Sequence, residues 1–170
     1  MPLAMAVDLN SAQQQGDFYD LFLMALCVWR EARGQSMEAK RCVSWVIRNR
    51  ADQPGWWGGP SIASVVLKPW QFSSFNQHDP NSSKLPLPAD PSWVASLIAA
   101  QEGFTKSAKD PTLGATHYYD RSLDPDQNKP DHQPVWAVDG SYSLLADVGD
   151  FHFYKAAHSM GGHDLEGYKS

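Results

Sequence analysis

Apolar residues recur at helical spacing in the first third of the chain. Residues 17–33 are apolar almost all round, which is typical of a helix in the middle of a core. Asp17 is the predicted N-cap of this helix, and Gly34 ends it. A second helix is predicted over residues 36–52, with Ser36 as its N-cap, because apolar residues recur there three and four positions apart. The pattern therefore predicts two packed helices that begin the core.

Shorter elements follow these two helices. A short helix is predicted over residues 61–67 with Ser61 as its N-cap, and Pro91 suits the first turn of a third long helix. Two strand-like runs, residues 115–119 and 151–154, are expected to pair with each other. The segments between these elements are rich in Pro, Ser, Asn or Asp and are expected to be loops. The predicted fold class is mainly α (α+β), with a small β element.

Length and charge narrow the class of protein. The 170 residues suit a single domain over residues 17–170, preceded by a polar, Gln-rich lead-in over residues 1–16. The 14 Lys and Arg against 19 Asp and Glu give a net charge of −5, which argues against a nucleic-acid partner. The longest apolar run, residues 21–29, is far shorter than the roughly 20 residues that span a bilayer. We expect a monomer that does not insert into membranes.

The chain contains two cysteines, Cys27 and Cys42. This number excludes a disulfide scaffold and a metal site built from paired cysteines. If the first two helices fold back on each other as a hairpin, the two thiols come level. They are then either two small buried apolar residues or, in an oxidising compartment, a disulfide.

Glu31 is the candidate catalytic residue. It follows a run of nine apolar residues on a helix that must be buried, whereas Glu38, Glu102 and Glu166 lie among polar neighbours. A carboxyl group that is partly removed from water holds its proton more readily, as a general acid must. The alternative is a structural ion pair between Glu31 and an arginine at the end of the helix. Composition alone leaves both interpretations open.

The order of motifs along the chain resembles that of the SleB-like cell-wall hydrolases, the family of the spore cortex-lytic enzymes. Four blocks carry the resemblance: Glu-Ala-Arg-Gly at residues 31–34, Val-Ile-Arg-Asn-Arg at 46–50, Ser-Ile-Ala-Ser-Val-Val at 61–66 followed by Pro-Trp-Gln-Phe-Ser at 69–73, and Asp-Pro-Thr-Leu-Gly-Ala-Thr-His-Tyr-Tyr at 110–119. Two departures concern substrate preference: Gln35 replaces the second Glu of the signature, and the loop over residues 76–90 is longer than usual.

The resemblance implies a compact helical fold similar to lysozymes and resuscitation-promoting factors. It also implies cleavage of peptidoglycan glycan strands between N-acetylmuramic acid and N-acetylglucosamine, by a lytic transglycosylase with one catalytic Glu and no cofactor. Glu31 would be the acid, and the cleft would be lined by Gln71, Phe72, Ser73, Thr112, Tyr118 and Tyr119. Hydroxyl and amide side chains suit the hydrogen bonds of a glycan, and Trp70 and Phe72 could stack on sugar faces.

Other chemistries stay open at this point. A muramidase that uses water would need a second carboxylate, for which Asp120 is the candidate. A zinc amidase would need metal ligands, but none of the six histidines shows His-Glu-x-x-His spacing, so no metal site is expected. We expect His117 and His152 to be satisfied polar groups beside the cleft. A non-catalytic glycan-binding module would lack an acid at position 31.

The N-terminal sequence shows no cationic segment followed by an apolar one, so no secretory signal is visible. We therefore expect an enzyme that is made in the host cytoplasm and reaches the wall after release, as a phage endolysin does. The same sequence would also suit a bacterial enzyme whose signal has been trimmed.

Overall fold

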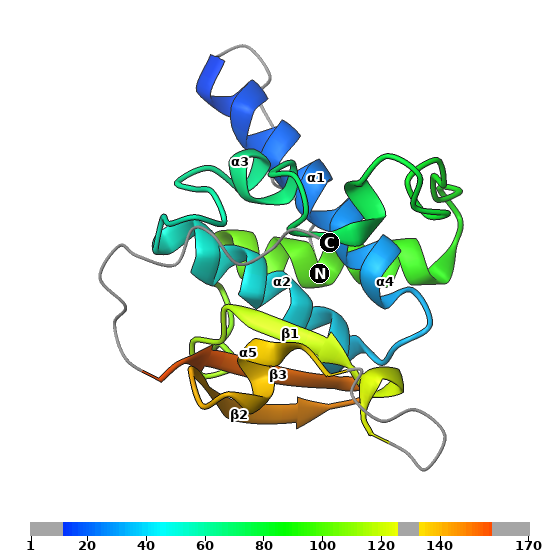
Figure 1. Ribbon diagram of the computed structural model, residues 1–170. Coiled ribbons are helices and arrows are strands. Elements are labelled where there is room, and N and C mark those ends of the chain that lie inside the picture. The colour runs from blue at the N-terminus through cyan, green and yellow to red at the C-terminus, as the bar shows by residue number, and fades with distance from the viewer. Residues whose placement is uncertain (1–11, 126–132, 158–170) are drawn as a thin grey trace.

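Helices form one layer of the protein, and a small antiparallel sheet forms the other (Figure 1). The computed structural model describes residues 12–125 and 133–157. Within these ranges the elements are α1 (Ala12–Ala32), α2 (Met37–Asp52), α3 (Ile62–Val66), η1 (Ser73–Phe75), α4 (Pro91–Thr105), β1 (His117–Asp120), η2 (Arg121–Leu123), α5 (Val135–Val138), β2 (Tyr142–Val148) and β3 (Phe151–Ala156). The expected fold class is confirmed.

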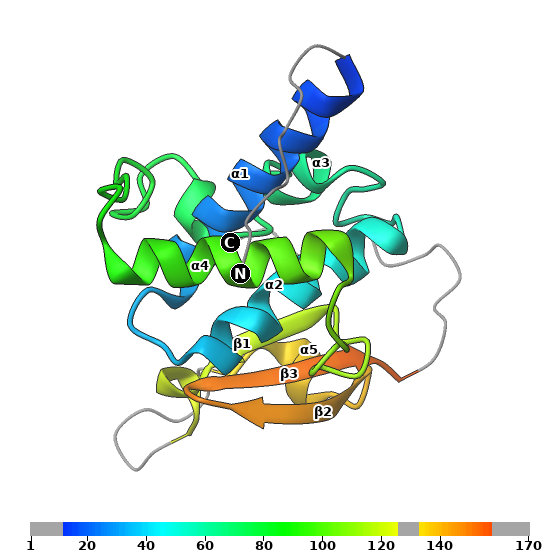
Figure 2. The same ribbon diagram turned by 180° about the vertical axis from the view of Figure 1, so that it is seen from behind.

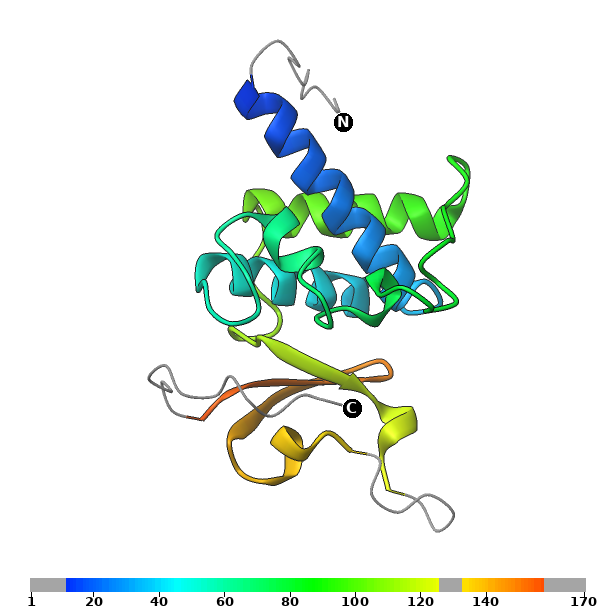
Figure 3. The ribbon, with the colours of Figure 1, turned by 45° about the horizontal axis from the view of Figure 1, so that its top comes forward.

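Helix α1 is the centre of the helical layer and contacts α2, α3 and α4, as Figures 2 and 3 show. Its residues from Leu23 to Trp29 are each at most 6% exposed, as predicted for a core helix. The expected N-cap at Asp17 is wrong, because α1 already begins at Ala12. Gln13 donates a hydrogen bond to Asp17 one turn further on, so this carboxylate supports the helix from within. Five residues of the expected lead-in therefore belong to α1, and residues 1–11 lie outside the described ranges.

The N-caps predicted for the next two helices are confirmed. The Ser36 hydroxyl accepts a hydrogen bond from the backbone N–H of Ala39, and the Ser61 hydroxyl accepts one from that of Ser64. Asp20 on α1 accepts from two further N–H groups at the start of α3, which joins these two helices. Local capping therefore also fixes how the helices sit against each other.

The last turn of α1 is held by Lys40 of α2. The buried Lys40 ammonium donates to the backbone carbonyls of Ala32, Arg33 and Gln35, at 2.7 to 3.0 Å. Burial lowers the pKa of Lys40. The carbonyls at a helix end lack the next turn's N–H groups as partners, and Lys40 supplies donors there beside the Gln35 N–H that also binds Ala32, so this contact fixes the end of α1 that carries Glu31.

Cys27 and Cys42 are both free thiols and both fully buried. Burial raises the pKa of Cys27 well above its usual value and that of Cys42 to about 12. The interpretation as two small buried apolar residues is confirmed, and both thiols stay protonated at neutral pH.

The sheet has the strand order β1-β3-β2, and both pairs are antiparallel. The predicted pairing of the first and last strands is confirmed, with Tyr118 opposite Phe153. Strand β2 was not predicted. Because successive side chains of a strand point to opposite faces, Tyr118 and Phe153 face the helices, while Tyr119 faces the side that α5 covers (Figure 3).

The second face of the sheet carries an aromatic cluster around His117. The rings of Trp56, Trp57, Trp136 and Tyr142 all lie within 6 Å of the His117 ring centroid. Burial lowers the pKa of His117 to about 2, so the ring is neutral at physiological pH. It is a satisfied polar group, as expected, through a 3.0 Å contact with Thr116. It lies on the face of the sheet opposite Tyr118, so it is not beside the cleft.

No helix in the described part of the chain combines the length and the apolar character that spanning a membrane requires.

Candidate active site

Glu31 lies in the last turn of α1, where three segments of the chain meet. Its side chain is partly buried. Oε1 accepts a hydrogen bond from the Ser74 hydroxyl at 2.5 Å, and Oε2 accepts one from the Tyr118 hydroxyl at 3.0 Å. Ser74 belongs to η1 and Tyr118 to β1. The carboxylate is therefore held between the helical layer and the sheet by two neutral donors.

The alternative of a structural ion pair at Glu31 is wrong. Arg30 directs its guanidinium to backbone carbonyls, and Arg33 lies over the Trp29 ring and donates to Asn81. Among the residues described, no cation lies within 4.0 Å of the Glu31 carboxylate. The reason is helical geometry, because side chains one and two positions away point to other sides of the helix. The carboxyl group is left with only hydroxyl partners and one long contact from the Ser74 N–H.

Arg30 holds the segment that contains Ser74. Its guanidinium donates to the backbone carbonyls of Ser74, Ser82 and Lys84 at 2.8 to 3.2 Å, and it covers one side of the Phe75 ring. Burial lowers the pKa of Arg30. A guanidinium presents five donors in a fixed fork, so one side chain can fix both ends of the loop over residues 74–84. We call this contact the Arg30 clamp.

Tyr118 approaches Glu31 from the sheet. Its ring packs against Phe151 and Phe153, with ring centroids 5.2 and 5.7 Å away. Burial, and next the negative charge of Glu31, raise the pKa of Tyr118 well above its usual value. Tyr118 therefore remains a hydroxyl donor at every pH at which the enzyme could work.

Arg50 joins the two segments that reach Glu31. This buried side chain donates to the backbone carbonyl of Thr116 at 2.6 Å and to the side-chain oxygen of Gln71 at 3.3 Å. Its guanidinium also lies 5.2 Å from the Phe72 ring centroid. Burial lowers the pKa of Arg50 to about 10, so it remains charged at neutral pH. Gln71 is thus tied to the strand that carries Tyr118.

The other residues predicted for the cleft have different surroundings. Phe72 is 2% exposed and belongs to the core, and Thr112 is fully buried and bonded to Asp110. Ser73 is exposed on η1, and Trp70 is 80% exposed. Tyr119 lies on the opposite face of the sheet, where its hydroxyl donates to Asp124. Of the predicted set, only Tyr118 contacts Glu31.

Ser74 is the residue that the sequence argument missed. It is 1% exposed and makes the shortest contact with Glu31, whereas the chosen neighbour, Ser73, faces solvent. The block of residues 69–73 pointed to the correct segment. The sequence signal reached the adjacent serine but could not tell which of the two hydroxyls is buried against Glu31.

Asp120 has a local role in the structure. Its side chain accepts from the Ser122 N–H at 2.8 Å and caps η2. No hydrogen bond joins it to Glu31 within the described ranges.

The structure describes three of the six histidines, for which no metal site was expected: His78, His117 and His152. His152 is held by Asp124 and Asp147, and His78 is exposed in a loop. In the part of the chain that the structure describes, no three His, Cys, Asp or Glu side chains are grouped to hold a metal ion. His132, His158 and His163 lie outside that part.

A partly buried carboxyl group with two hydroxyl donors and no ion-pair partner can give a proton to a ligand oxygen and later take one back. Comparison with known protein families shows which class of enzyme has this site. The sequence model described as Cell Wall Hydrolase matches residues 34–154, which is more than two thirds of the chain. The chain belongs to the cell wall hydrolase family.

Two solved structures share the fold of this cell wall hydrolase. The catalytic domain of the Bacillus cereus SleB protein is 20% identical with a TM-score of 0.57, over 80% of this chain and 89% of that one. The catalytic domain of the germination-specific lytic transglycosylase SleB from Bacillus anthracis gives the same identity and TM-score, over 80% and 93%. None of the curated proteins matches the sequence. The predicted SleB-like family and its lysozyme-like helical fold are confirmed.

Family membership makes this cell wall hydrolase a peptidoglycan-cleaving enzyme. The alternative of a non-catalytic glycan-binding module is therefore set aside. The family match begins three positions after Glu31, so the role of that residue rests on the geometry described above.

Proposed function

We propose that this cell wall hydrolase is a lytic transglycosylase in which Glu31 is the single catalytic acid and base. The observation that carries the proposal is the setting of Glu31: two neutral hydroxyl donors, no cation within 4.0 Å and no hydrogen-bonded second carboxylate among the described residues. The fold supports it, because the similar SleB domain of Bacillus anthracis is itself described as a lytic transglycosylase.

In the first step Glu31 gives its proton to the oxygen between N-acetylmuramic acid and N-acetylglucosamine, and the bond from that oxygen to C1 of the muramic acid breaks. The N-acetylglucosamine end leaves as an alcohol, and the muramic acid ring passes through an oxocarbenium-like state. The carboxylate that Glu31 becomes is stabilised by hydrogen bonds from Ser74 and Tyr118.

In the second step this carboxylate removes the proton from the 6-hydroxyl of the same muramic acid. The oxygen bonds to C1, which closes a 1,6-anhydro ring and returns the proton to Glu31. An intramolecular hydroxyl held near C1 has a large advantage over water. Hydrolysis would instead require a second carboxylate, about 5–5.5 Å away for a nucleophile or 6.5–9.5 Å for a base. Asp120 is engaged in capping η2.

Mass spectrometry of digested peptidoglycan tests the proposal. We expect muramic acid ends that are about 18 Da lighter than hydrolysis products, because no water is added. We expect Glu31→Gln to lower the rate at least about 100-fold, since the amide cannot donate the proton. Its melting temperature should stay at or above that of the wild type. Asp120→Asn is the matched control and should keep most of the activity.

Three results would contradict this assignment. Reducing muramic acid ends together with an inactive Asp120→Asn variant would indicate a muramidase. Loss of activity in EDTA that zinc restores would indicate the amidase. A Glu31→Gln variant of nearly wild-type rate would show that another group is the acid. The endolysin role stays a prediction, which lysis of a host that produces the chain with and without a holin would test.

A further inference from the structure

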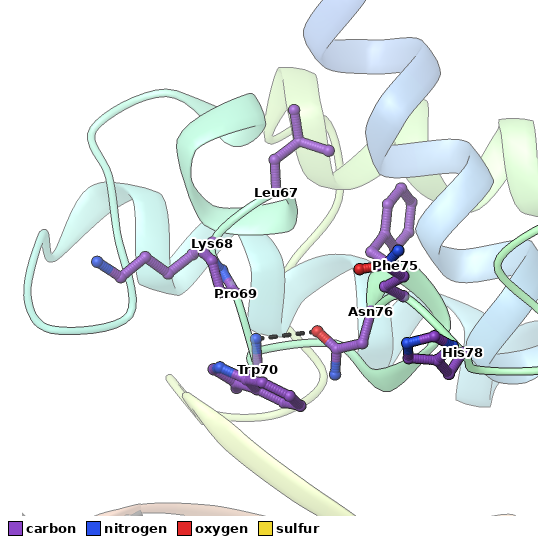
Figure 4. Close-up of a pocket in the computed structure, with 8 residues that line it drawn as sticks. Leu67, Lys68, Pro69, Trp70, Phe75, Asn76 and His78 are labelled. Carbon is purple, nitrogen blue, oxygen red and sulfur yellow. Dashed lines mark hydrogen bonds between the residues drawn. The ribbon is translucent and has the colours of Figure 1, made fainter.

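A groove of about 470 Å³ lies between the segment after α3 and the segment that begins with the last residue of η1 (Figure 4). Residues 67–70, after α3, form one side, and residues 75–78 form the other. Phe75 follows Ser74 directly, and Ser74 binds the Glu31 carboxylate. One wall of the groove is therefore continuous with the segment that binds Glu31, and Arg30, the residue before Glu31, covers the Phe75 ring of that wall.

Trp70 presents its ring to solvent in this groove. Its side chain is 80% exposed, although a large aromatic side chain would normally be packed. Its backbone adopts φ 69°, which is unfavourable for a bulky residue, and its N–H donates to Asn76 Oδ1 at 3.0 Å. His78, across the groove, has φ 80°. Such conformations persist where the surroundings hold them and occur often at binding sites.

Two of the residues that line the groove, Asn76 and Gln77, carry neutral amide side chains, and His78 adds an imidazole. Asn76 uses its side-chain oxygen to hold Trp70, and no acceptor among the described residues binds its Nδ2. Lys68 points away from the groove in Figure 4, and none of the lining residues is acidic. Arg30 covers one side of the Phe75 ring, so the indole of Trp70 is the open aromatic surface. An aromatic face beside a free amide donor suits a neutral ring with hydroxyl and acetamido groups.

We propose that this groove is a subsite for one acetamido sugar of the glycan strand, which stacks on Trp70 and accepts a hydrogen bond from Asn76. The assignment rests on the proposed function, because it takes the strand bound at Glu31 to continue past Ser74. Trp70 is then a residue that binds the sugar away from the reacting bond. Asn76 has two roles: its amide nitrogen donates to the sugar, and its amide oxygen holds Trp70 in position. The enzyme then prefers strands long enough to fill the groove.

Binding is measured without catalysis, in the full chain carrying Glu31→Gln. The probe is the peptide-free tetramer of N-acetylglucosamine, followed through the indole N–H signals in two-dimensional NMR. Trp70→Phe assigns the Trp70 signal. We expect the tetramer to shift that signal, and we expect Trp70→Ala to weaken tetramer binding about tenfold. Val135→Ala, an exposed apolar residue on α5, is the matched control and should leave binding unchanged.

Two variants separate the roles of Asn76. Asn76→Asp keeps the oxygen that holds the Trp70 backbone and loses the amide donor, whereas Asn76→Ala loses both. We expect both to weaken tetramer binding, and only Asn76→Ala to move the Trp70 signal of the free protein. Trp70→Tyr, which keeps an aromatic face, should restore part of the affinity.

The proposal fails if the tetramer binds without shifting the Trp70 signal or with equal affinity to Trp70→Ala. It also fails if a free stem peptide, and not the tetramer, shifts that signal. Failure of the proposed function would look different: hydrolytic product masses with Trp70 still responding to the tetramer would overturn the transglycosylase and keep the subsite.

Discussion

The two hydroxyl groups that bind the Glu31 carboxylate come from residues 43 and 87 positions further along the chain. The position of Glu31 after an apolar run made it a candidate, and the resemblance of the motifs around it singled it out as the expected acid. Ser74 could not be separated from Ser73, because η1 is a single turn in an irregular segment and offers no periodicity. The adjacent Tyr118 and Tyr119 had to point to opposite faces of a strand, but the sequence did not show which face meets the helices.

The adjacent tyrosines provide a matched test at the scale of single residues. Tyr118→Phe removes the donor to Glu31 and keeps the ring between Phe151 and Phe153. We expect the catalytic efficiency kcat/KM on peptidoglycan to fall about 10- to 100-fold, as for the loss of a hydrogen bond to a charged group. Rates of muropeptide release give the measurement.

Tyr119→Phe is the control for that experiment. It removes a hydroxyl that donates to Asp124 on the other face of the sheet. We expect wild-type activity with a slightly lower melting temperature. The reverse result, a slow Tyr119→Phe and a normal Tyr118→Phe, would show that substrate binds on the α5 side of the sheet.

The elements differed in how well they could be predicted. Helices α2 and α3 follow from periodicity and from serine caps that act locally. Strand β2 was missed because its burial does not alternate and its register shifts between Leu144 and Ala146, which breaks the period of two. The extent of α1 was misjudged because Asp17 is a good cap in isolation but lies inside the longer helix.

Helix α4 packs closely against its neighbours at Gly103. A Cβ atom there would lie 2.7 Å from Ser44 Oγ and 3.0 Å from Met24 Cε. Ser44 Oγ is itself bonded to the Ala99 carbonyl, so it cannot move without losing that contact. We expect Gly103→Ala to lower the free energy of unfolding by about 1–2 kcal/mol, measured by urea denaturation.

Gly16 provides the control for this packing argument. It is an exposed residue of α1 with no atom within 4 Å of the added Cβ. There Ala should raise the free energy of unfolding by about 0.5–1 kcal/mol through helix propensity. Equal effects of the two substitutions would refute a close contact at Gly103.

At the scale of the whole molecule, both faces of the sheet carry side chains that bind other parts of the protein. One face supplies Tyr118 to the candidate active site. The other carries His152, whose ring nitrogens contact Asp124 and Asp147. This contact joins β3 to the neighbouring strand β2 and to the segment after η2, which lies 28 positions earlier in the chain.

His152 makes this fastening pH-dependent. Burial alone would lower the pKa of His152, but its hydrogen bonds with the two aspartates outweigh burial and raise that pKa. A raised pKa in the folded protein means that the stabilisation is complete below the unfolded value near 6.5 and is lost as the pH rises through the folded value. His152 in turn lowers the pKa of Asp124, so the contact also weakens in acid.

Melting temperatures at pH 6 and pH 8.5 test this dependence. We expect the difference between the wild type and His152→Gln to be larger at pH 6. A contribution of about 1 kcal/mol corresponds to about 2–4 °C for a chain of this size. The difference between the two proteins is used because neutral His117 changes the stability of both in the same way. A difference that is independent of pH would contradict the role given to His152.

The Arg30 clamp has a consequence for how freely this enzyme can vary. Arg30 binds the backbone oxygens of Ser74, Ser82 and Lys84, and every amino acid provides such an oxygen. Apart from Phe75, whose ring Arg30 also covers, the side chains between Ser74 and Lys84 take no part in this clamp, so they can diverge while the hydroxyl of Ser74 stays against the acid. Substrate preference can then change by exchange of the loop alone, because its anchor recognises the path of the main chain and not its sequence.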